Sequence, residues 1–390
     1  MKVIHIAPTP FFSNRGCHIR IRNEIEGLQQ NGIKVILCTY HHGNNVPGLD
    51  VRRIRAIPGY TKTSAGYSPF KFVADILLFF LVFKTVWRER PVLIHGHLHE
   101  GALLGWLVSI FLYWRRIPVV MDMQGSLSGE LKAYGVFTSF PLLLRFFLVI
   151  EKIICRLPHF IVCSSLDSLS FLRRVCKIED NKSSMLQDVV PEKFFQTHDK
   201  SYWRRTYGIP EDKSVVIYTG SFLTGKGIEY LLEGMKLLLS KRKDLFFIYL
   251  GYPEEPVLEF VRKHGLTNNS MVVGEVSYDE LSGWLSVADV AVEPKMADSG
   301  EASGKVLHYM ASALPVVCFD LINNRNFLAD NGFYAEPGLV SSLAAAIEVA
   351  VADPVKAAQK AKNGRIKLEN DYSLAGVGLK LAELYDKLLK

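Results

Sequence analysis

The chain has 390 residues, of which 49% are hydrophobic and 22% are charged. The composition is that of a folded protein and excludes a disordered or repetitive chain, and the length predicts two domains. The formal net charge of +7 is uneven, because residues 1–190 hold 23 Lys and Arg against 13 Asp and Glu. No helix-turn-helix, zinc-finger or RNA-binding motif accompanies this charge, so we expect no nucleic-acid partner.

Six cysteines are spread along the chain without a CxxC pair, which favours free thiols in a reducing compartment. The N-terminal apolar run is too short for a signal peptide. The longest apolar stretches, Ile76–Phe83 and Gly101–Trp114, fall short of the roughly 20 residues that span a bilayer. We therefore expect a cytoplasmic protein, bound at most to the membrane surface.

Along the first half of the chain, short apolar strands alternate with helical patterns, which predicts a parallel sheet covered on both faces. The predicted strands are Val3–Ala7, Lys34–Tyr40, Asp50–Ile54, Val92–His95, Pro118–Met121 and Phe160–Cys163. The predicted helices are Ile19–Asn31, Phe70–Trp87, Gly101–Trp114 and Leu142–Arg156.

The same alternation restarts after residue 200 and predicts a second doubly wound unit, joined to the first near residues 188–200. Its predicted strands are Val215–Thr219, Leu245–Leu250, Met271–Val273, Val290–Val292 and Pro315–Phe319. Its predicted helices are Ile228–Lys241, Pro256–His264, Tyr278–Val287, Gly304–Ala313 and Ser341–Ala352, followed by a closing helix over Tyr372–Leu389. Ligands of such sheets bind beyond the carboxyl ends of the strands, so we expect the site in the cleft between the units.

A glycine-rich segment with one lysine, Thr219–Gly227, follows an apolar strand and opens a helix. Glycines such as Gly220 and Gly227 let backbone N–H groups approach an anion, and Lys226 adds a full charge. The spacing is not that of a Walker A loop. The segment predicts a diphosphate site; the alternative is an ordinary strand-to-helix turn with a solvated lysine.

A second segment, Pro294–Ala311, also follows a strand and opens a helix. Backbone donors near Ser303 and Gly304 would bind phosphate together with Lys305, and Glu301 would hold sugar hydroxyls. The alternative is a helix capped by Ser303, with Glu301 exposed to solvent.

Three histidines alternate at positions 95, 97 and 99. On one strand they would share a face, but no carboxylate or cysteine cluster joins them in the sequence. We therefore expect no metal site, and the chain contains no Asp-x-Asp motif. We expect His95, His97 and His99 to be ordinary polar loop residues; the alternative is a role near the acceptor cleft.

These segments together resemble the family 4 retaining glycosyltransferases of the GT-B fold. The resemblance is carried by Gly220 to Gly227, by the run from Ala288 through Pro315-Val316-Val317, and by the closing helix from Asp371 to Leu389. It implies an α/β protein of two doubly wound, Rossmann-like domains facing across a cleft. Residues 1–190 would bind the acceptor and 200–371 the nucleotide sugar, with the helix near 372–390 crossing back to the first domain.

The resemblance also implies site residues. Gly16 would make room for the diphosphate, and His308 would lie at the nucleotide ribose. Ser221 replaces an Arg that usually accompanies the loop lysine, so Lys295 or Arg325 would supply the missing phosphate contact. Gln124 stands where the family often has a His, and Gln cannot take a proton.

The resulting hypothesis is transfer of a sugar, with retention, from a nucleotide diphosphate sugar to an acceptor hydroxyl. Lys226, Glu301 and Gln124 would be the catalytic residues, and no metal or cofactor is expected. The acceptor would be a lipid-linked glycan or glycolipid precursor in cell-surface polysaccharide assembly. The alternatives are a catalytically silent donor-binding subunit, and an epimerase or phosphorylase of the same fold.

The basic first half also contains the chain's most apolar helical stretches, Phe70–Trp87, Gly101–Trp114 and Val136–Arg156. This combination predicts docking on an anionic membrane surface. The alternative is that these helices are simply buried and the charges form a solvated rim. The basic residues predicted to bind lipid are Arg52, Arg53, Arg55, Lys62, Lys71, Arg88, Arg90, Arg115 and Arg116.

Overall fold

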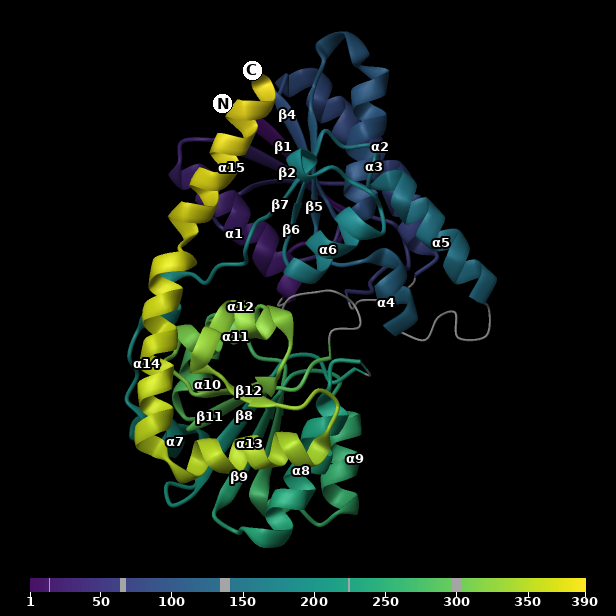
Figure 1. The fold of residues 1–390 in the computed structure, drawn as a ribbon. Helices are drawn as coiled ribbons and strands as arrows, with labels where there is room; N and C mark the ends of the chain where they lie inside the picture. The colour runs from purple at the N-terminus through teal and green to yellow at the C-terminus, as the bar shows by residue number, and fades with distance from the viewer. Residues whose placement is uncertain (14, 64–67, 134–140, 224, 297–302) are drawn as a thin grey trace. The chain divides into compact units, whose positions relative to one another are not determined.

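The computed structural model describes the whole chain except residues 14, 64–67, 134–140, 224 and 297–302 (Figure 1). The described residues form two compact units. Unit 1 contains Met1–Val189 and Leu374–Lys390, and unit 2 contains residues 190–296 and 303–373. The two ends of the chain therefore belong to the same unit.

Unit 1 is built on a seven-stranded sheet in the order β3-β2-β1-β4-β5-β6-β7, in which every neighbouring pair is parallel. The strands are β1 (Lys2–Ala7), β2 (Lys34–Thr39), β3 (Asp50–Arg53), β4 (Leu93–His97), β5 (Val119–Met123), β6 (Phe160–Cys163) and β7 (Ser183–Met185). The central strands are buried along their length, as expected for strands covered on both faces.

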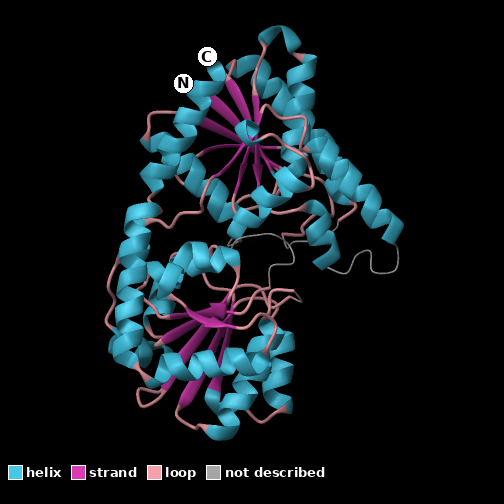
Figure 2. Cartoon of the chain, in the orientation of Figure 1, coloured by secondary structure: helices cyan, strands magenta, loops and turns pink. Residues whose placement is uncertain are grey.

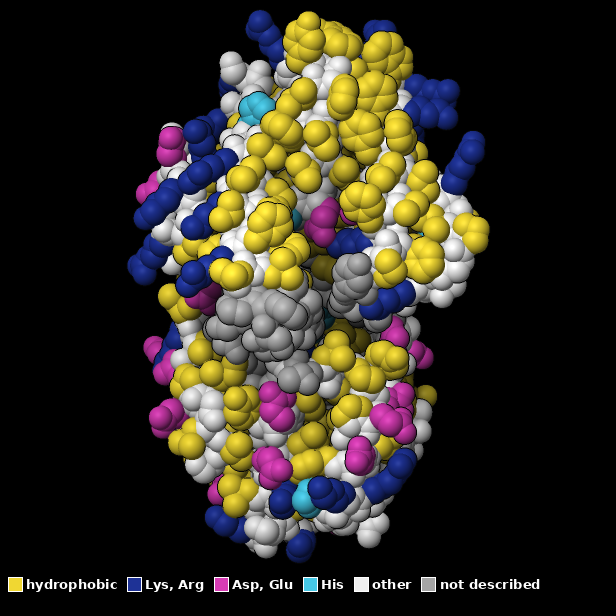
Figure 3. All heavy atoms as spheres, turned by 90° about the vertical axis from the view of Figure 1, so that its right-hand side faces the viewer, with side chains coloured by type: hydrophobic (Ala, Val, Ile, Leu, Met, Phe, Trp, Pro, Cys, Tyr) yellow, Lys and Arg dark blue, Asp and Glu magenta, His cyan; other side chains and the backbone are white. Residues whose placement is uncertain are grey.

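Helices cover this sheet on both sides (Figure 2). They are α1 (Gly16–Gln30), α2 (Phe70–Glu89), α3 (Leu98–Phe111), α4 (Leu127–Ala133), α5 (Pro141–Ile154), α6 (Leu166–Arg174) and α15 (Leu374–Leu389). The outer faces of α2, α3 and α5 carry many exposed hydrophobic side chains (Figure 3).

Unit 2 is built on a six-stranded parallel sheet in the order β10-β9-β8-β11-β12-β13. The strands are β8 (Ser214–Thr219), β9 (Leu245–Leu250), β10 (Ser270–Gly274), β11 (Val290–Glu293), β12 (Val316–Phe319) and β13 (Phe333–Ala335). The helices are α7 (Lys200–Tyr207), α8 (Ile228–Lys241), α9 (Glu255–Lys263), α10 (Leu281–Ser286), α11 (Lys305–Ala311), α12 (Ile322–Leu328), α13 (Val340–Ala352) and α14 (Pro354–Asp371).

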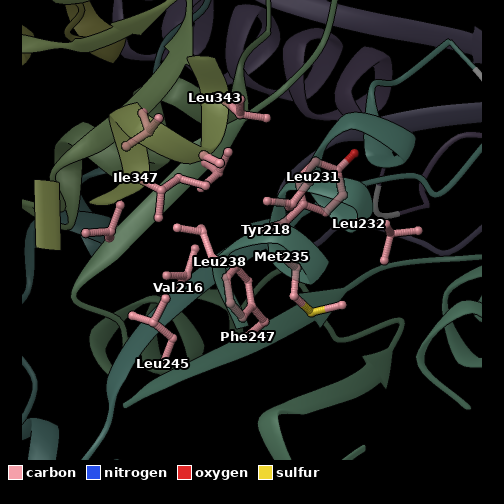
Figure 4. Packing of buried hydrophobic residues seen from close by; sticks show 14 of the residues in the cluster. Val216, Tyr218, Leu231, Leu232, Met235, Leu238, Leu245, Phe247, Leu343 and Ile347 are labelled. Atoms are coloured by element: carbon pink, nitrogen blue, oxygen red, sulfur yellow. The ribbon is translucent and has the colours of Figure 1, made fainter. Parts of the chain in front are cut away.

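The core of unit 2 lies between its sheet and helices α8 and α13 (Figure 4). Met235 and Leu238 of α8 pack against Val216 and Phe247 of the sheet, and Leu343 adds the contribution of α13. These side chains are almost fully buried. The packing fixes where α8 begins, and therefore where the loop that precedes it lies.

The predicted α/β class with two doubly wound units is confirmed. The six cysteines are free, as expected, and all but Cys17 are buried. Seven of the described helices and strands were not predicted: the short helices α4, α6, α7 and α12, the longer helix α14, and the strands β7 and β13. The two strands have three residues each, too few to show a period. The buried face of α14 is made of Ala357, Ala361, Gly364 and Leu368, whose mostly small side chains give little hydrophobic signal.

Helix α15 packs across α1 through two glycines. A Cβ on Gly378 would overlap the carbonyl oxygen of Gly27, and a Cβ on Gly27 would lie 2.7 Å from the carbonyl oxygen of Leu374. Tyr385 of α15 is fully buried and reaches the strand residue His95. The C-terminal helix is thus an integral part of unit 1.

We expect Gly378→Ala to destabilise unit 1 by about 1–3 kcal/mol, because the methyl group forces the two helices apart. Gly234→Ala in α8 is the matched control: a Cβ there meets nothing within 4 Å, so the change should be neutral or stabilising. Thermal unfolding followed by circular dichroism compares the two. Equal melting temperatures would show that the close approach of α1 and α15 contributes little.

Candidate functional site

The predicted donor segments flank the point where the strand order of unit 2 reverses. From β8 the sheet continues through β9 and β10 on one side, and β11 begins the other side. The loop 220–227 follows β8, and residues 294–304 follow β11. Open parallel sheets bind ligands at such a switch point, at the carboxyl ends of the strands. The sequence therefore predicted both loops at the edge where a ligand is expected.

Glycines pack these loops backbone against backbone. Gly227 has a φ of 82°, and a Cβ there would overlap the carbonyl oxygen of Pro294. A Cβ on Gly251, which follows β9, would likewise overlap the carbonyl oxygen of Gly220. These positions therefore require glycine for packing between loops, whether or not an anion also approaches them.

A buried carboxylate that the sequence analysis missed, Glu293, organises the loop after β11. It ends the strand with 1% of its surface exposed, and Oε1 accepts a hydrogen bond from the backbone N–H of Lys295 at 3.0 Å. Oε2 accepts from Ser303 Oγ at 2.7 Å and lies 3.2 Å from Lys305 Nζ. The signal was present in the sequence, because an acidic residue ending an otherwise apolar strand is unusual.

Lys305 and Lys226 both lie near Tyr218. Lys305 Nζ is 4.3 Å from the centre of the Tyr218 ring, and its side chain passes over Gly220, where a Cβ would lie 2.9 Å from Nζ. Burial raises the pKa of Tyr218 well above its usual value, Glu293 raises it further, and the charge of Lys226 opposes the shift. Two cations from two loops thus lie on one side of the sheet edge.

The remaining predicted residues of unit 2 are mostly engaged within the protein. His308 is neutral at physiological pH, since burial lowers its pKa to about 4. Its Nε2 pairs with Tyr278 Oη at 2.8 Å and its Nδ1 with the carbonyl of Gly304 at 3.0 Å. Ser221 accepts bonds from Tyr218 and Leu223. A contact of His308 with nucleotide ribose stays a prediction.

Two further predictions concern the start of α11. Helix α11 begins at Lys305 with Gly304 as its N-cap, and no side chain caps it. Ser303 is therefore not the cap that the alternative assumed, because its hydroxyl donates to Glu293. Glu301 lies outside the described residues.

The two residues predicted to replace the missing phosphate contact are Arg325 and Lys295. Arg325 pairs with Asp320 and stacks on Tyr334, and Lys295 is buried.

In unit 1, Gly16 is the first residue of α1, which follows the loop after β1. It is exposed, and a Cβ there would meet nothing within 4 Å. Its φ is not positive, so the protein itself does not require glycine at this position. This is what the predicted role as space for a ligand calls for.

Gln124, which follows β5, is buried and donates from Nε2 to Asp122 Oδ2 at 2.8 Å. Asp122 also accepts from His97 Nδ1 at 2.9 Å and from Arg20 Nε at 3.0 Å. Burial alone would raise the pKa of Asp122, but Arg20 and His97 outweigh it and hold the pKa well below its usual value. Gln124 is therefore part of a buried polar network around one carboxylate.

The expectation about the three alternating histidines was wrong in two respects. Strand β4 ends at His97, so His99 lies in α3 and does not share the strand face. Carboxylates do join all three: Glu24 lies 3.8 Å from His95, Asp122 is 2.9 Å from His97, and Glu151 is 3.3 Å from His99. They come from α1, β5 and α5, so spacing in the sequence could not reveal them.

Comparison with models of known protein families identifies the family of this chain. A model described as "Glycosyl transferase 4-like domain" matches residues 15–180, and one described as "Glycosyl transferases group 1" matches residues 213–353. Together the two matches cover most of both units. The chain belongs to the family 4 glycosyltransferases of the GT-B fold, and the predicted resemblance is confirmed.

Curated relatives are glycosyltransferases at low identity. A capsular polysaccharide biosynthesis glycosyltransferase of Staphylococcus aureus is 22% identical over 95% of this chain and 94% of its own. An alpha-D-kanosaminyltransferase of Streptomyces kanamyceticus is 27% identical, over 47% of this chain and 48% of its own. The chain thus spans about half the length of the second relative.

Solved structures share the fold over nearly the whole chain. A sucrose-phosphate synthase of Thermosynechococcus elongatus aligns with a TM-score of 0.82 at 20% identity, covering 99% of this chain and 98% of its own. Anabaena HepE in complex with UDP-glucose aligns with a TM-score of 0.76 at 16% identity, covering 99% and 100%. At such identity these likenesses establish the fold alone.

We expect Gly16→Ala to leave the melting temperature unchanged or slightly raised, since the new methyl group meets open space in a helix. Sugar transfer should fall on the order of 10²-fold, the loss expected when a reacting group is displaced by about an ångström. Gly234→Ala serves again as the control and should keep its activity. Full activity of the Gly16 variant would show that no ligand needs the space.

Proposed function

We propose that this glycosyltransferase moves a sugar from a nucleotide diphosphate sugar to an acceptor hydroxyl on a lipid-linked glycan, with retention of configuration. The observation that carries the donor part of the proposal is Lys305 over the Tyr218 ring at the switch point of unit 2, with Lys226 of the preceding loop near enough to lower the pKa of the same tyrosine. Anabaena HepE, of the same fold, binds UDP-glucose.

The chemical task is to stabilise the negative charge that develops on the leaving diphosphate. Lys226 and Lys305 supply positive charge, and the helix start at Gly227 and the backbone donors near Gly304 add partial charges. Lys305 is already paired with Glu293 at 3.2 Å, so a phosphate would compete with that carboxylate for the ammonium group. In the proposed mechanism the two lysines and these backbone groups bind the diphosphate without a divalent ion.

The carboxylates that the donor segments offer bear on how the proposed retention would be achieved. A double displacement needs a carboxylate free to attack the sugar. Glu293 is buried and holds Ser303, Lys305 and the backbone of Lys295, so it is unsuited to that task. The proposal is therefore attack on the same face of the sugar, assisted by the donor phosphate, with Glu301 orienting the sugar and Gln124 binding a hydroxyl.

The proposed acceptor class rests on an apolar surface of unit 1, here called the apolar face. Its side chains recur at helical spacing along one side of α5 and α2, and they continue onto α3 and the turn that follows it. All are more than one third exposed: Phe72, Val73, Ile76, Phe80, Trp87, Ile110, Phe111, Tyr113, Trp114, Leu142, Phe146, Val149 and Ile153. Figure 3 shows this gathering of hydrophobic side chains.

The helices of the apolar face are also buried on their opposite sides. Because both sides carry hydrophobic residues, these stretches are unusually apolar in the sequence. In α2 the buried stripe is Ala74, Leu78, Val82 and Val86. Aromatic contacts connect α2 to α3 and to the turn that follows α3, because Phe79 lies beside Phe111 and Trp87 lies beside Trp114. An exposed apolar area of this extent on a monomer marks an interaction surface.

Basic side chains accompany the apolar face, as an anionic bilayer requires. Exposed members on or beside its helices are Lys84, Arg88, Arg90, Arg116 and Arg145. Three of the predicted basic residues are engaged elsewhere: Arg52 pairs with Glu89, Arg53 binds backbone carbonyls, and Lys71 pairs with Glu100. No helix among the described residues is long and apolar enough to cross a bilayer. The proposal is therefore surface attachment with shallow insertion.

Lys226→Ala should lower turnover by about 10²-fold or more, because it removes a charge that stabilises the leaving group. Lys236→Ala, an exposed lysine of α8, is the matched control and should retain activity. Nucleotide release from UDP-, GDP- and ADP-sugars with a lipid-linked acceptor measures both. The anomeric configuration of the product, read by NMR, tests retention.

Other outcomes of this assay would replace the proposal. Activity of the Lys226 variant within a few-fold of the parent would exclude the loop as the diphosphate site. Transfer that depends on added Mg²⁺ or Mn²⁺ would contradict the metal-free mechanism. Nucleotide-sugar binding without turnover would indicate a silent subunit, and conversion of the donor without an acceptor would indicate an epimerase.

The apolar face should bind vesicles that contain an anionic phospholipid at low salt, and Phe80→Ser with Phe146→Ser should abolish sedimentation with them. Replacing Arg88 or Arg116 by Ala should weaken binding about fivefold each, since one basic residue contributes about 1 kcal/mol. Val355→Ser, which removes an 80% exposed side chain of unit 2, should have no effect. Protein that stays in the supernatant and glycosylates a soluble acceptor readily would contradict membrane docking.

A further inference from the structure

A cluster of buried ionisable groups lies inside unit 1, between α1 and the sheet. Its members are Glu24 of α1 and the strand residues His95 and His97, each at most 1% exposed. One ligand atom from each of the three lies within 4.8 Å of the others. Nothing in the proposed transfer reaction uses Glu24 or His95.

In both histidines one ring nitrogen is bonded to a protein partner, which is the usual arrangement of histidines that bind metals. Asp122 accepts from His97 Nδ1 at 2.9 Å, and a carboxylate only accepts, so His97 Nε2 carries a lone pair. His95 Nδ1 lies 2.5 Å from the hydroxyl of Tyr385. Histidine ligands of metals almost always bond through their other nitrogen to such a partner, and a carboxylate is a common one.

Two atoms that face each other inside the cluster, Glu24 Oε2 and His95 Nε2, lack hydrogen-bond partners among the described residues. The other carboxylate oxygen of Glu24, Oε1, is ion-paired with Arg20 at 3.0 Å. Glu24 Oε2 is 3.8 Å from His95 Nε2, too far for a hydrogen bond. Ligands of a tetrahedral zinc ion lie roughly 3.3 Å apart. Binding an ion would therefore draw together ligand atoms that are now separated by up to 4.8 Å.

Charge counting points the same way. The network contains two buried carboxylates, Glu24 and Asp122, a partly exposed one, Asp188, and one guanidinium, Arg20, that pairs with all three. With neutral histidines the two buried carboxylates exceed the one guanidinium in charge. Isolated buried charge is costly, and a bound cation would offset the excess.

We propose that Glu24, His95 and His97 bind one zinc ion, with Asp122 and Tyr385 orienting the two histidines. Two imidazoles and a carboxylate suit zinc, which takes nitrogen and oxygen ligands at about 2.0–2.2 Å. His5 Nδ1, 2.9 Å from His97 Nε2, is placed to become the fourth ligand. The ion would tie α1 to the sheet, and it takes no part in sugar transfer.

The test is metal analysis of the full chain, purified without a histidine tag. We expect about one zinc per chain by mass spectrometry, or after stripping with a chelator and adding zinc. Cobalt in its place should give the visible absorption of a tetrahedral site. Zinc should also raise the melting temperature of the stripped protein, a readout independent of activity.

Glu24→Gln and His95→Gln should each lose the metal and the thermal shift. His99→Gln is the matched control, since it changes another buried histidine that lies beside Glu151 and outside the cluster. Metal retained equally by all three variants would mean adventitious binding and overturn the proposal. If the variants do not fold, parent protein that takes up less than about a tenth of an equivalent of zinc or cobalt, with no thermal shift, overturns it alone.

Discussion

The backbone approach of Gly227 to Pro294 is the constraint on which the proposed donor site of unit 2 depends. It holds the loop after β8 against the loop after β11, and Gly251 against Gly220 adds the loop after β9. A larger residue at Gly227 or Gly251 would collide with the backbone of the neighbouring loop and move the loops apart.

Glu293 then sets the electrostatics of this edge. The buried carboxylate neutralises part of the charge of Lys305 and holds its ammonium group in place. A diphosphate bound there would compete with this carboxylate for the ammonium group. Glu293 also holds Ser303 and the backbone of Lys295, so one carboxylate positions three groups of the same loop.

Unit 1 combines a buried polar network with an exposed apolar surface. Its interior contains a network of Arg20, Asp122, Glu24 and several histidines, while the outer sides of α2, α3 and α5 expose aromatic and aliphatic side chains. Both features are costly unless a ligand compensates them, because buried charges need partners and exposed apolar surface needs cover. We propose a divalent ion as the partner of the first environment and a bilayer as the partner of the second.

The sequence by itself determined the fold class, most elements and the positions of both glycine loops, because apolar periodicity and glycine spacing are local signals. It did not reveal α14, whose buried face is mostly small side chains, or the strands β7 and β13 of three residues each. It identified Lys226 and Lys305 but missed Glu293, since its role depends on a contact with a residue twelve positions away. Only the tertiary structure brought Glu24 and Asp122 to the histidines of β4, because contacts between α1, β4 and β5 leave no mark on sequence spacing.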